Sequence, residues 1–118
     1  MGAAVELVDG GVAVQVADAS VIPIFYNDCS AEAGQGAKAR LTPEPSAPMM
    51  QPVAVTPDRA GRLARHYIGC TQDQCIDISY QRTLASRSGS AWAGEIDAGH
   101  SPFLSQPDRL TAMLVALV

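Results

Sequence analysis

The chain has 118 residues, 47% of them hydrophobic and 5% aromatic, which is typical of one small globular domain rather than a disordered polypeptide. Eight basic and twelve acidic residues give a formal net charge of −4, and the arginines are scattered, so no nucleic-acid partner is expected. No apolar run reaches the length of a membrane span, and the first residues lack the basic and apolar regions of a signal peptide. We therefore expect a cytoplasmic protein with no membrane partner.

The three cysteines predict free thiols rather than a disulfide or a metal site. Cys29, Cys70 and Cys75 are an odd number without C-x-x-C spacing, and neither histidine is paired with them at the spacing of a zinc finger. We expect the thiols to stay reduced in a cytoplasm, and we expect no metal and no cofactor.

The front part, residues 1–56, is predicted to begin with a β-hairpin. In AVELVDGGVAVQVA, apolar and polar residues alternate on both sides of an Asp-Gly-Gly turn. The apolar cluster VIPIFY follows, and Ser30 is expected to cap a short helix over 31–41 that two glycines weaken. The Pro-rich stretch TPEPSAPMMQPVAVTP is expected to form neither a helix nor a central strand. We interpret it as a linker or an extended surface segment at the boundary between the two parts.

The back part, residues 57–118, is predicted to alternate strands and helices. A turn begins at Pro57, and ARHYIGC and AWAGEID are predicted strands. The helix between them, CIDISYQRTLASRS, is expected to end near Gly89, and the last helix is expected in SQPDRLTAMLVALV, with Ser105 and Asp108 as a capping box. Strand–helix–strand with a parallel crossover is the unit of an open α/β sheet, so the predicted fold class is α/β.

A loop follows each predicted strand, and each loop carries a candidate catalytic residue. Functional groups of open α/β sheets gather at the carboxyl ends of the strands, so Asp73 and His100 are expected to lie side by side. An acid beside a histidine fixes the imidazole tautomer, and the imidazole can then take a proton from a serine or a thiol. Asp77 is the competing acid, but we expect it inside the following helix, and TQDQ alone would also fit an Asx turn. His66 is interpreted as structural or exposed.

Two segments of the back part resemble the carboxyl-terminal part of α/β-hydrolase-fold esterases. They are RHYIGCTQDQCI with YQRTLA, and EIDAGHSPFLSQPDRLTAML. Further upstream, FYNDCSAEAGQGAKARLTPEPSAPMMQPVAVTPDRAG resembles the cap segment of bacterial members. The most similar branch is that of plant methylesterases, hydroxynitrile lyases and bacterial carboxylesterases. This resemblance implies that residues 1–56 are part of a cap, or lid, and that residues 57–118 are the last β-α-β-α unit of the core.

The resemblance also implies the roles of individual residues. Asp73 would be the acid and His100 the base of a catalytic triad, and Ile24, Phe25 and Met49 would belong to the substrate pocket. The implied substrate is a small ester, or a cyanohydrin in the lyase branch. The nucleophile elbow G-x-S-x-G and the oxyanion-hole loop of the family have no counterpart in these 118 residues. We therefore expect a truncated or split esterase that is inactive unless a separate half supplies the nucleophile.

Two other hypotheses stay open. In one, the chain is a non-catalytic remnant that pairs its open sheet edge with a partner or forms a homodimer, because two parallel strands leave an edge unpaired. In the other, it is a small active hydrolase with an unrecognised serine. In a completed active site, oxidation of Cys75 would matter, since this thiol lies close in sequence to Asp73.

Overall fold

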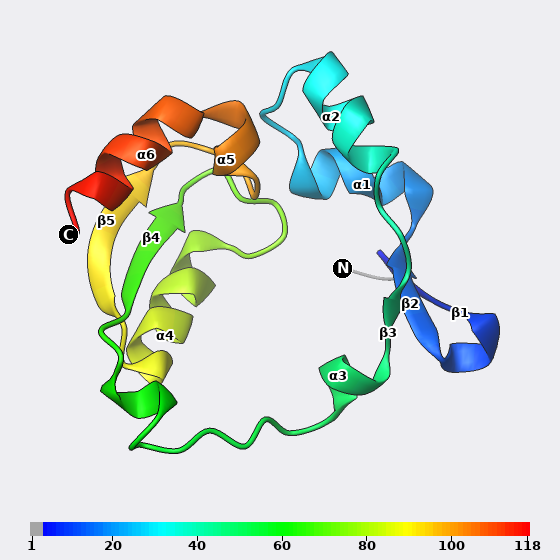
Figure 1. The fold of residues 1–118 in the computed structure, drawn as a ribbon. Helices are drawn as coiled ribbons and strands as arrows, with labels where there is room; N and C mark the ends of the chain where they lie inside the picture. Colours follow the sequence, from blue (N-terminus) through cyan, green and yellow to red (C-terminus); the bar gives the residue numbers. More distant parts are fainter. Residues whose placement is uncertain (1–3) are drawn as a thin grey trace.

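A computed structural model of the chain describes residues 4–118, which form two parts joined by an extended segment (Figure 1). The front part contains β1 (Val5–Val8), β2 (Ala13–Val16), α1 (Asp18–Phe25), α2 (Ala31–Lys38), β3 (Glu44–Pro45) and α3 (Ala47–Met50). The back part contains β4 (His66–Cys70), α4 (Ile78–Ser88), β5 (Ala91–Ile96), α5 (Pro102–Ser105) and α6 (Pro107–Val115). Short 3-10 helices lie at Asp9–Gly11 and Ala60–Arg62. The predicted front part also includes residues 1–3, which lie outside the described residues.

The predicted hairpin is present. β1 and β2 pair antiparallel from Val5 opposite Val16 to Val8 opposite Ala13, and β3 adds a two-residue strand to the other edge of β2. The connection needs positive φ angles, 67° at Gly10 and 90° at the next glycine. Glycine adopts this conformation without a steric penalty, so the two glycines explain the tight reversal of the chain.

The helices of the front part differ from the sequence prediction in two places. The capped helix is confirmed as α2, where Oγ of Ser30 accepts a hydrogen bond from the N–H of Ala33 at 3.2 Å. The cluster VIPIFY, however, lies mostly in α1, although Pro23 sits inside that helix. The Pro-rich stretch was predicted to exclude any helix, and this is wrong for α3, a single turn with Pro48 near its start. Proline is tolerated there because N–H groups of a first turn have no intrahelical partner.

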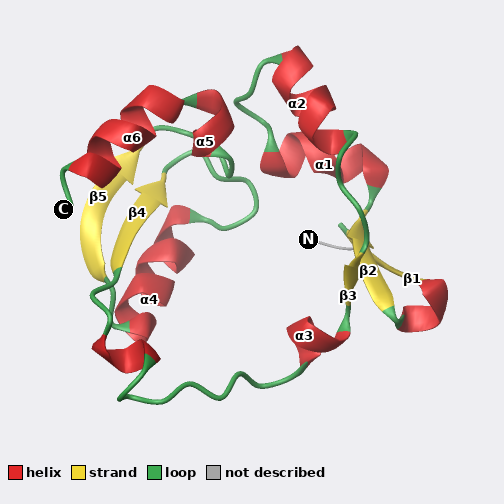
Figure 2. Ribbon diagram, in the orientation of Figure 1, coloured by secondary structure: helices red, strands yellow, loops and turns green. Residues whose placement is uncertain are grey.

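The back part is built on two parallel strands. β4 and β5 pair from His66 opposite Ala91 to Cys70 opposite Ile96, with one irregularity near Tyr67. Figure 2 shows α4 and α6 flanking these strands. The predicted strand–helix–strand order is confirmed, and α4 ends as predicted at Gly89, whose φ is 66°.

Two helix starts in the back part differ from the prediction. Asp77 was expected inside the helix, but it is the N-cap of α4, and its Oδ1 accepts a hydrogen bond from the N–H of Ser79 at 2.8 Å. The predicted last helix is α6, which begins at Pro107 because Gln106 has non-helical φ and ψ angles, and the short helix α5 before it was not predicted. Gln106 is therefore the N-cap of α6, and the capping box predicted at Ser105 is absent from this helix. Among the residues described, none of the helices has the length and apolar character needed to cross a membrane.

A glutamine side chain completes the outer edge of β4. Gln81, which is 2% exposed, accepts a hydrogen bond from the N–H of Cys70 at 2.9 Å. Its Nε2 donates to the carbonyl of Cys70 at 2.9 Å and to that of Ile76 at 2.7 Å. The amide thus binds the backbone groups of Cys70 that point away from β5. It fixes the end of β4, where the loop that carries Asp73 (the acid loop) begins.

Replacing Gln81 with leucine is expected to lower the free energy of unfolding by about 2 kcal/mol or more, since backbone groups of Cys70 lose their partners. Urea unfolding followed by circular dichroism measures this change. Gln35→Leu is the matched control, because Gln35 is exposed on α2. If the two variants unfold at the same urea concentration, Gln81 does not hold the end of β4.

Candidate active site

Asp73 lies in the loop after β4, and both of its carboxylate oxygens have hydrogen-bond partners. Its Oδ1 accepts hydrogen bonds from the N–H groups of Cys75 at 2.7 Å and Ile76 at 3.0 Å, and this is an Asx turn. Its Oδ2 lies 3.0 Å from Nδ1 of His100. The side chain is only 6% exposed. The carboxylate therefore has one orientation, which faces the imidazole.

The His100 ring lies in the loop after β5 and is 31% exposed. Because a carboxylate accepts from Nδ1, the neutral ring carries its proton on Nδ1, and Nε2 is left with a free lone pair. Phe25 of α1 packs edge-on against the same ring, with a centroid distance of 5.0 Å and an angle of 70°. The front part of the chain thus contributes one wall around the candidate base.

A network of hydrogen bonds joins the acid loop to the loop after β5 that carries His100, which we call the base loop. The N–H of Thr71 donates to the carbonyl of Ile96, and that of Gln72 to the carbonyl of Ala98, both at 3.0 Å. The carboxylate of Asp97 accepts from the Gln72 side chain at 2.9 Å and from the Thr71 hydroxyl at 2.7 Å. These bonds, from Gln72 first and then from Thr71, hold the pKa of Asp97 below its ordinary value. Asp97 therefore stays ionised and ties the two loops together.

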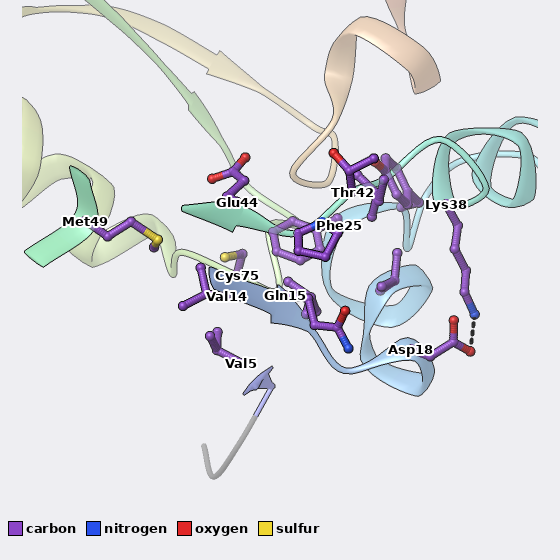
Figure 3. A pocket seen from close by; sticks show the side chains of 15 residues that line it. Val5, Val14, Gln15, Asp18, Phe25, Lys38, Thr42, Glu44, Met49 and Cys75 are labelled. Carbon is purple, nitrogen blue, oxygen red and sulfur yellow. Dashed lines mark hydrogen bonds and ion pairs between the residues drawn. The ribbon is translucent and has the colours of Figure 1, made fainter. Parts of the chain in front are cut away.

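A mostly apolar cavity of about 570 Å³ lies beside the site, within the front part (Figure 3). Phe25 and Met49, two of the residues predicted for the substrate pocket, line it, whereas Ile24 is not among its lining residues. Cys75 lines it from the acid loop. Because Phe25 contacts both the cavity and the His100 ring, the cavity adjoins the base.

Neither a serine partner nor a metal site accompanies the acid and the base in the described structure. No serine or threonine of residues 4–118 forms a hydrogen bond with the His100 ring, whose hydrogen-bond partner is Asp73. The adjacent Ser101 is 3% exposed, and its carbonyl accepts from Leu104 at the start of α5. Within the same residues, no three His, Cys, Asp or Glu side chains come together in a way that would hold a metal ion.

Two parallel strands, each followed at its carboxyl end by a loop that carries an acid or a histidine, form the α/β fold of the back part. Solved structures agree with this fold. A methylesterase from Arabidopsis superposes with a TM-score of 0.84 at 22% identity, over 98% of this chain and 52% of its own. Polyneuridine aldehyde esterase gives 0.78 at 21% identity, over 90% and 43%. A pyrethroid hydrolase from Sphingobium faniae JZ-2 gives 0.76 at 23% identity, over 96% and 46%.

The sequence is similar to those of two plant methylesterases. Methylesterase 7 of Arabidopsis thaliana is 33% identical over 66 residues, which are 55% of this chain and 25% of the relative. The putative chloroplastic methylesterase 14 of the same plant is 28% identical over 78 residues, 65% of this chain and 22% of the relative. No family model matches the chain. The predicted resemblance to a carboxyl-terminal part of methylesterase-like α/β-hydrolases is confirmed, and the chain spans about a quarter of the length of these relatives.

The Asp73 carboxylate also acts on a neighbouring thiol. Burial and then the charge of Asp73 raise the pKa of Cys75. The Asp73→Asn variant keeps the shape but loses the charge, so the thiol pKa falls and the thiolate fraction at neutral pH rises. We expect iodoacetamide to alkylate Cys75 about two- to fivefold faster in this variant, as measured by peptide mass spectrometry.

The control for this experiment is Asp58→Asn, which removes the same charge from an exposed residue of the extended segment. Its Cys75 alkylation rate is expected to match that of the parent chain. Equal rates in Asp73→Asn and Asp58→Asn would show that the Asp73 charge does not reach the thiol.

Proposed function

We propose that this chain carries the acid and the base of an ester-hydrolase active site. Asp73 is the acid and His100 is the general base. The proposal is supported above all by the 3.0 Å contact between Nδ1 of His100 and Oδ2 of Asp73 at the carboxyl ends of two parallel strands. The names of the relatives, which are methylesterases, an aldehyde esterase and a pyrethroid hydrolase, favour an ester as the substrate class.

The proposed chemistry follows from the tautomer of His100. With the Nδ1–H group hydrogen-bonded to Asp73 and its proton kept on Nδ1, Nε2 takes the proton of an attacking hydroxyl while the hydroxyl oxygen forms a bond to the ester carbonyl carbon. The imidazolium that results is stabilised by the adjacent Asp73 carboxylate. His100 then returns the proton to the leaving alcohol as the C–O bond breaks, and a water molecule repeats the cycle to release the acid.

The nucleophile in this proposal comes from polypeptide outside these 118 residues. The sequence match covers only about a quarter of methylesterase 7, and no G-x-S-x-G elbow occurs within these 118 residues. The donors that stabilise an oxyanion would come from the same missing region, and each is worth about 3 kcal/mol of barrier lowering. We regard the chain as one part of a split or longer esterase.

The front part would act as a portion of the cap over this site. Residues 1–56 supply Phe25 against the base and most of the cavity wall, while residues 57–118 supply the acid and the base. A cavity of about 570 Å³ with apolar walls suits the hydrocarbon part of a small ester. We propose a cytoplasmic location for the assembled enzyme, with no cofactor.

A graft tests the catalytic roles directly. Residues 4–118 would replace the matching half of the Arabidopsis methylesterase. That structure superposes on 98% of the length of this chain. We expect the graft to hydrolyse a short-chain chromogenic ester. His100→Ala or Asp73→Ala in the graft is expected to reduce kcat about 10³-fold or more, because each removes a member of the triad.

The control for the graft is His66→Ala, since His66 is an exposed residue at the start of β4. Its kcat is expected to stay within about twofold of the parent graft. A folded, active graft that keeps its kcat after His100→Ala would refute the role of His100. Hydrolysis by the 118-residue chain alone, lost in His100→Ala, would instead place the nucleophile within this chain.

The second candidate function, self-pairing without catalysis, is favoured by the apolar surface. Leu7, Met50 and Phe103 are 71%, 81% and 61% exposed, and large exposed apolar areas are typical of interaction surfaces. The edge of β4 opposite β5 is bound by a side chain at Cys70. Backbone groups alternate in direction along a strand, so the N–H of Ile68 points to the same outer edge.

Ile68→Pro removes that outward N–H and is expected to abolish association through the β4 edge. Size-exclusion chromatography with light scattering would show a mass that rises with concentration above 12.3 kDa for the parent chain and stays at 12.3 kDa for the variant. Val55→Pro, in the exposed extended segment, is the control. A parent chain that stays monomeric at high concentration contradicts self-pairing.

A further inference from the structure

Two adjacent residues of the front part bind the backbone on both sides of the acid–base pair. Asn27 and Asp28 lie in the turn between α1 and α2. Nδ2 of Asn27 donates to the carbonyl of Gln72 at 3.0 Å, and Oδ2 of Asp28 accepts from the N–H of Gly99 at 2.7 Å. Gln72 directly precedes the candidate acid, and Gly99 directly precedes the candidate base.

The contact at Gly99 leaves no room for a side chain. Gly99 is buried, and a Cβ atom built on it would lie 2.6 Å from Oδ1 of Asp28 and nearer still to Oδ1 of Asn27. The two side chains are therefore packed directly against the backbone that carries His100. This close approach explains why a glycine precedes the histidine.

The carboxylate of Asp28 contributes a hydrogen bond as well as packing. Its Oδ1 is buried and has no hydrogen-bond partner among residues 4–118. Burying a carboxylate is unfavourable, so a neutral side chain would be preferred if only packing mattered. A charged acceptor, however, forms a shorter and stronger hydrogen bond with a backbone N–H than a neutral acceptor does. The bond to Gly99 is the contact in which this charge takes part.

We propose that Asn27 and Asp28 are positioning residues for the acid–base pair. Asn27 holds the loop that carries Asp73, and Asp28 holds the loop that carries His100. Together they keep Nδ1 of His100 within hydrogen-bond distance of the acid and so maintain its tautomer. The inference rests on the proposed function, in which that tautomer leaves Nε2 free as a base.

Nitrogen NMR of the ¹⁵N-labelled 118-residue chain tests this role without any substrate. In the parent chain, the imidazole resonances of His100 should report a proton on Nδ1. Asp28→Ala and Asn27→Ala are each expected to shift His100 toward the Nε2-protonated tautomer. Asp28→Ala should also accelerate hydrogen exchange at the Gly99 amide about tenfold, the change expected from the loss of a charge-assisted hydrogen bond.

Two internal controls separate positioning from general destabilisation. Asp28→Asn retains an acceptor oxygen at the same place without the charge, and should shift the tautomer less than Asp28→Ala does. The resonances of His66, at the far end of β4, should not change in any variant. A merely structural role would lower stability without moving the tautomer of His100.

The outcomes also distinguish this inference from the proposed function. Unchanged His100 tautomers in Asp28→Ala and Asn27→Ala would refute the positioning role and leave ester hydrolysis untouched. If Asp28→Ala does not fold, Asn27→Ala decides alone, because Asn27 is exposed and an unchanged tautomer there overturns the proposal. A parent chain without a proton on Nδ1 would contradict the acid–base pair itself, and both proposals with it.

Discussion

The parallel pairing of β4 with β5 determines where the functional groups lie. The register ends with Cys70 opposite Ile96, so both loops leave the sheet at the same level. The pairing then continues past the strands, through the N–H groups of Thr71 and Gln72. A slip of one residue would move one loop by about 3.3 Å along the other, which is more than a hydrogen bond tolerates. The 3.0 Å contact between His100 and Asp73 is thus a consequence of the register.

Three carboxylates gather around this junction, and each is bound by different donors. Asp73 accepts from the imidazole and from its own Asx turn. Asp97 accepts from side chains of the acid loop, and Asp28 accepts from the backbone of the base loop at Gly99. Of the three, Asp73 is the one within hydrogen-bond distance of the imidazole, so it is the one that orients the ring. Asp73 thus contacts the imidazole, while Asp97 and Asp28 bind the loops on either side of it.

Local sequence patterns predicted the parts of this fold that depend on neighbouring residues. Glycine at the hairpin turn, Ser30 before α2 and Gly89 after α4 each act within their own segment, and each prediction is confirmed. The order of acid and base was predictable as well, since the carboxyl ends of parallel strands share one edge. These patterns operate over a few residues or through a general rule of sheet topology.

Interactions between distant segments explain what the sequence did not reveal. Pro23 and the branched residues around it disfavour a helix, but packing favours one, since a Cβ at Gly34 of α2 would lie only 3.3 Å from Cδ1 of Ile22. The bond from Gly99 to Asp28 joins residues 71 positions apart. Neither contact has a local signature. The contacts of Asn27 and Asp28 become visible only when the front part is placed against the loops that carry Asp73 and His100.

The contacts that hold Asp73 beside His100 all lie within this chain. Among residues 4–118, the buried apolar residues are few and mostly small, while many large apolar side chains are exposed in both parts. Such a surface favours association, and the free length of the β4 edge is the natural place for another strand. Gln81 already occupies that edge at Cys70, the residue next to the acid loop. An incoming strand would therefore pair with the earlier residues of β4 and leave the loops undisturbed. Whether the added strand belongs to a nucleophile-bearing region or to a second copy, the geometry of Asp73 and His100 does not have to change.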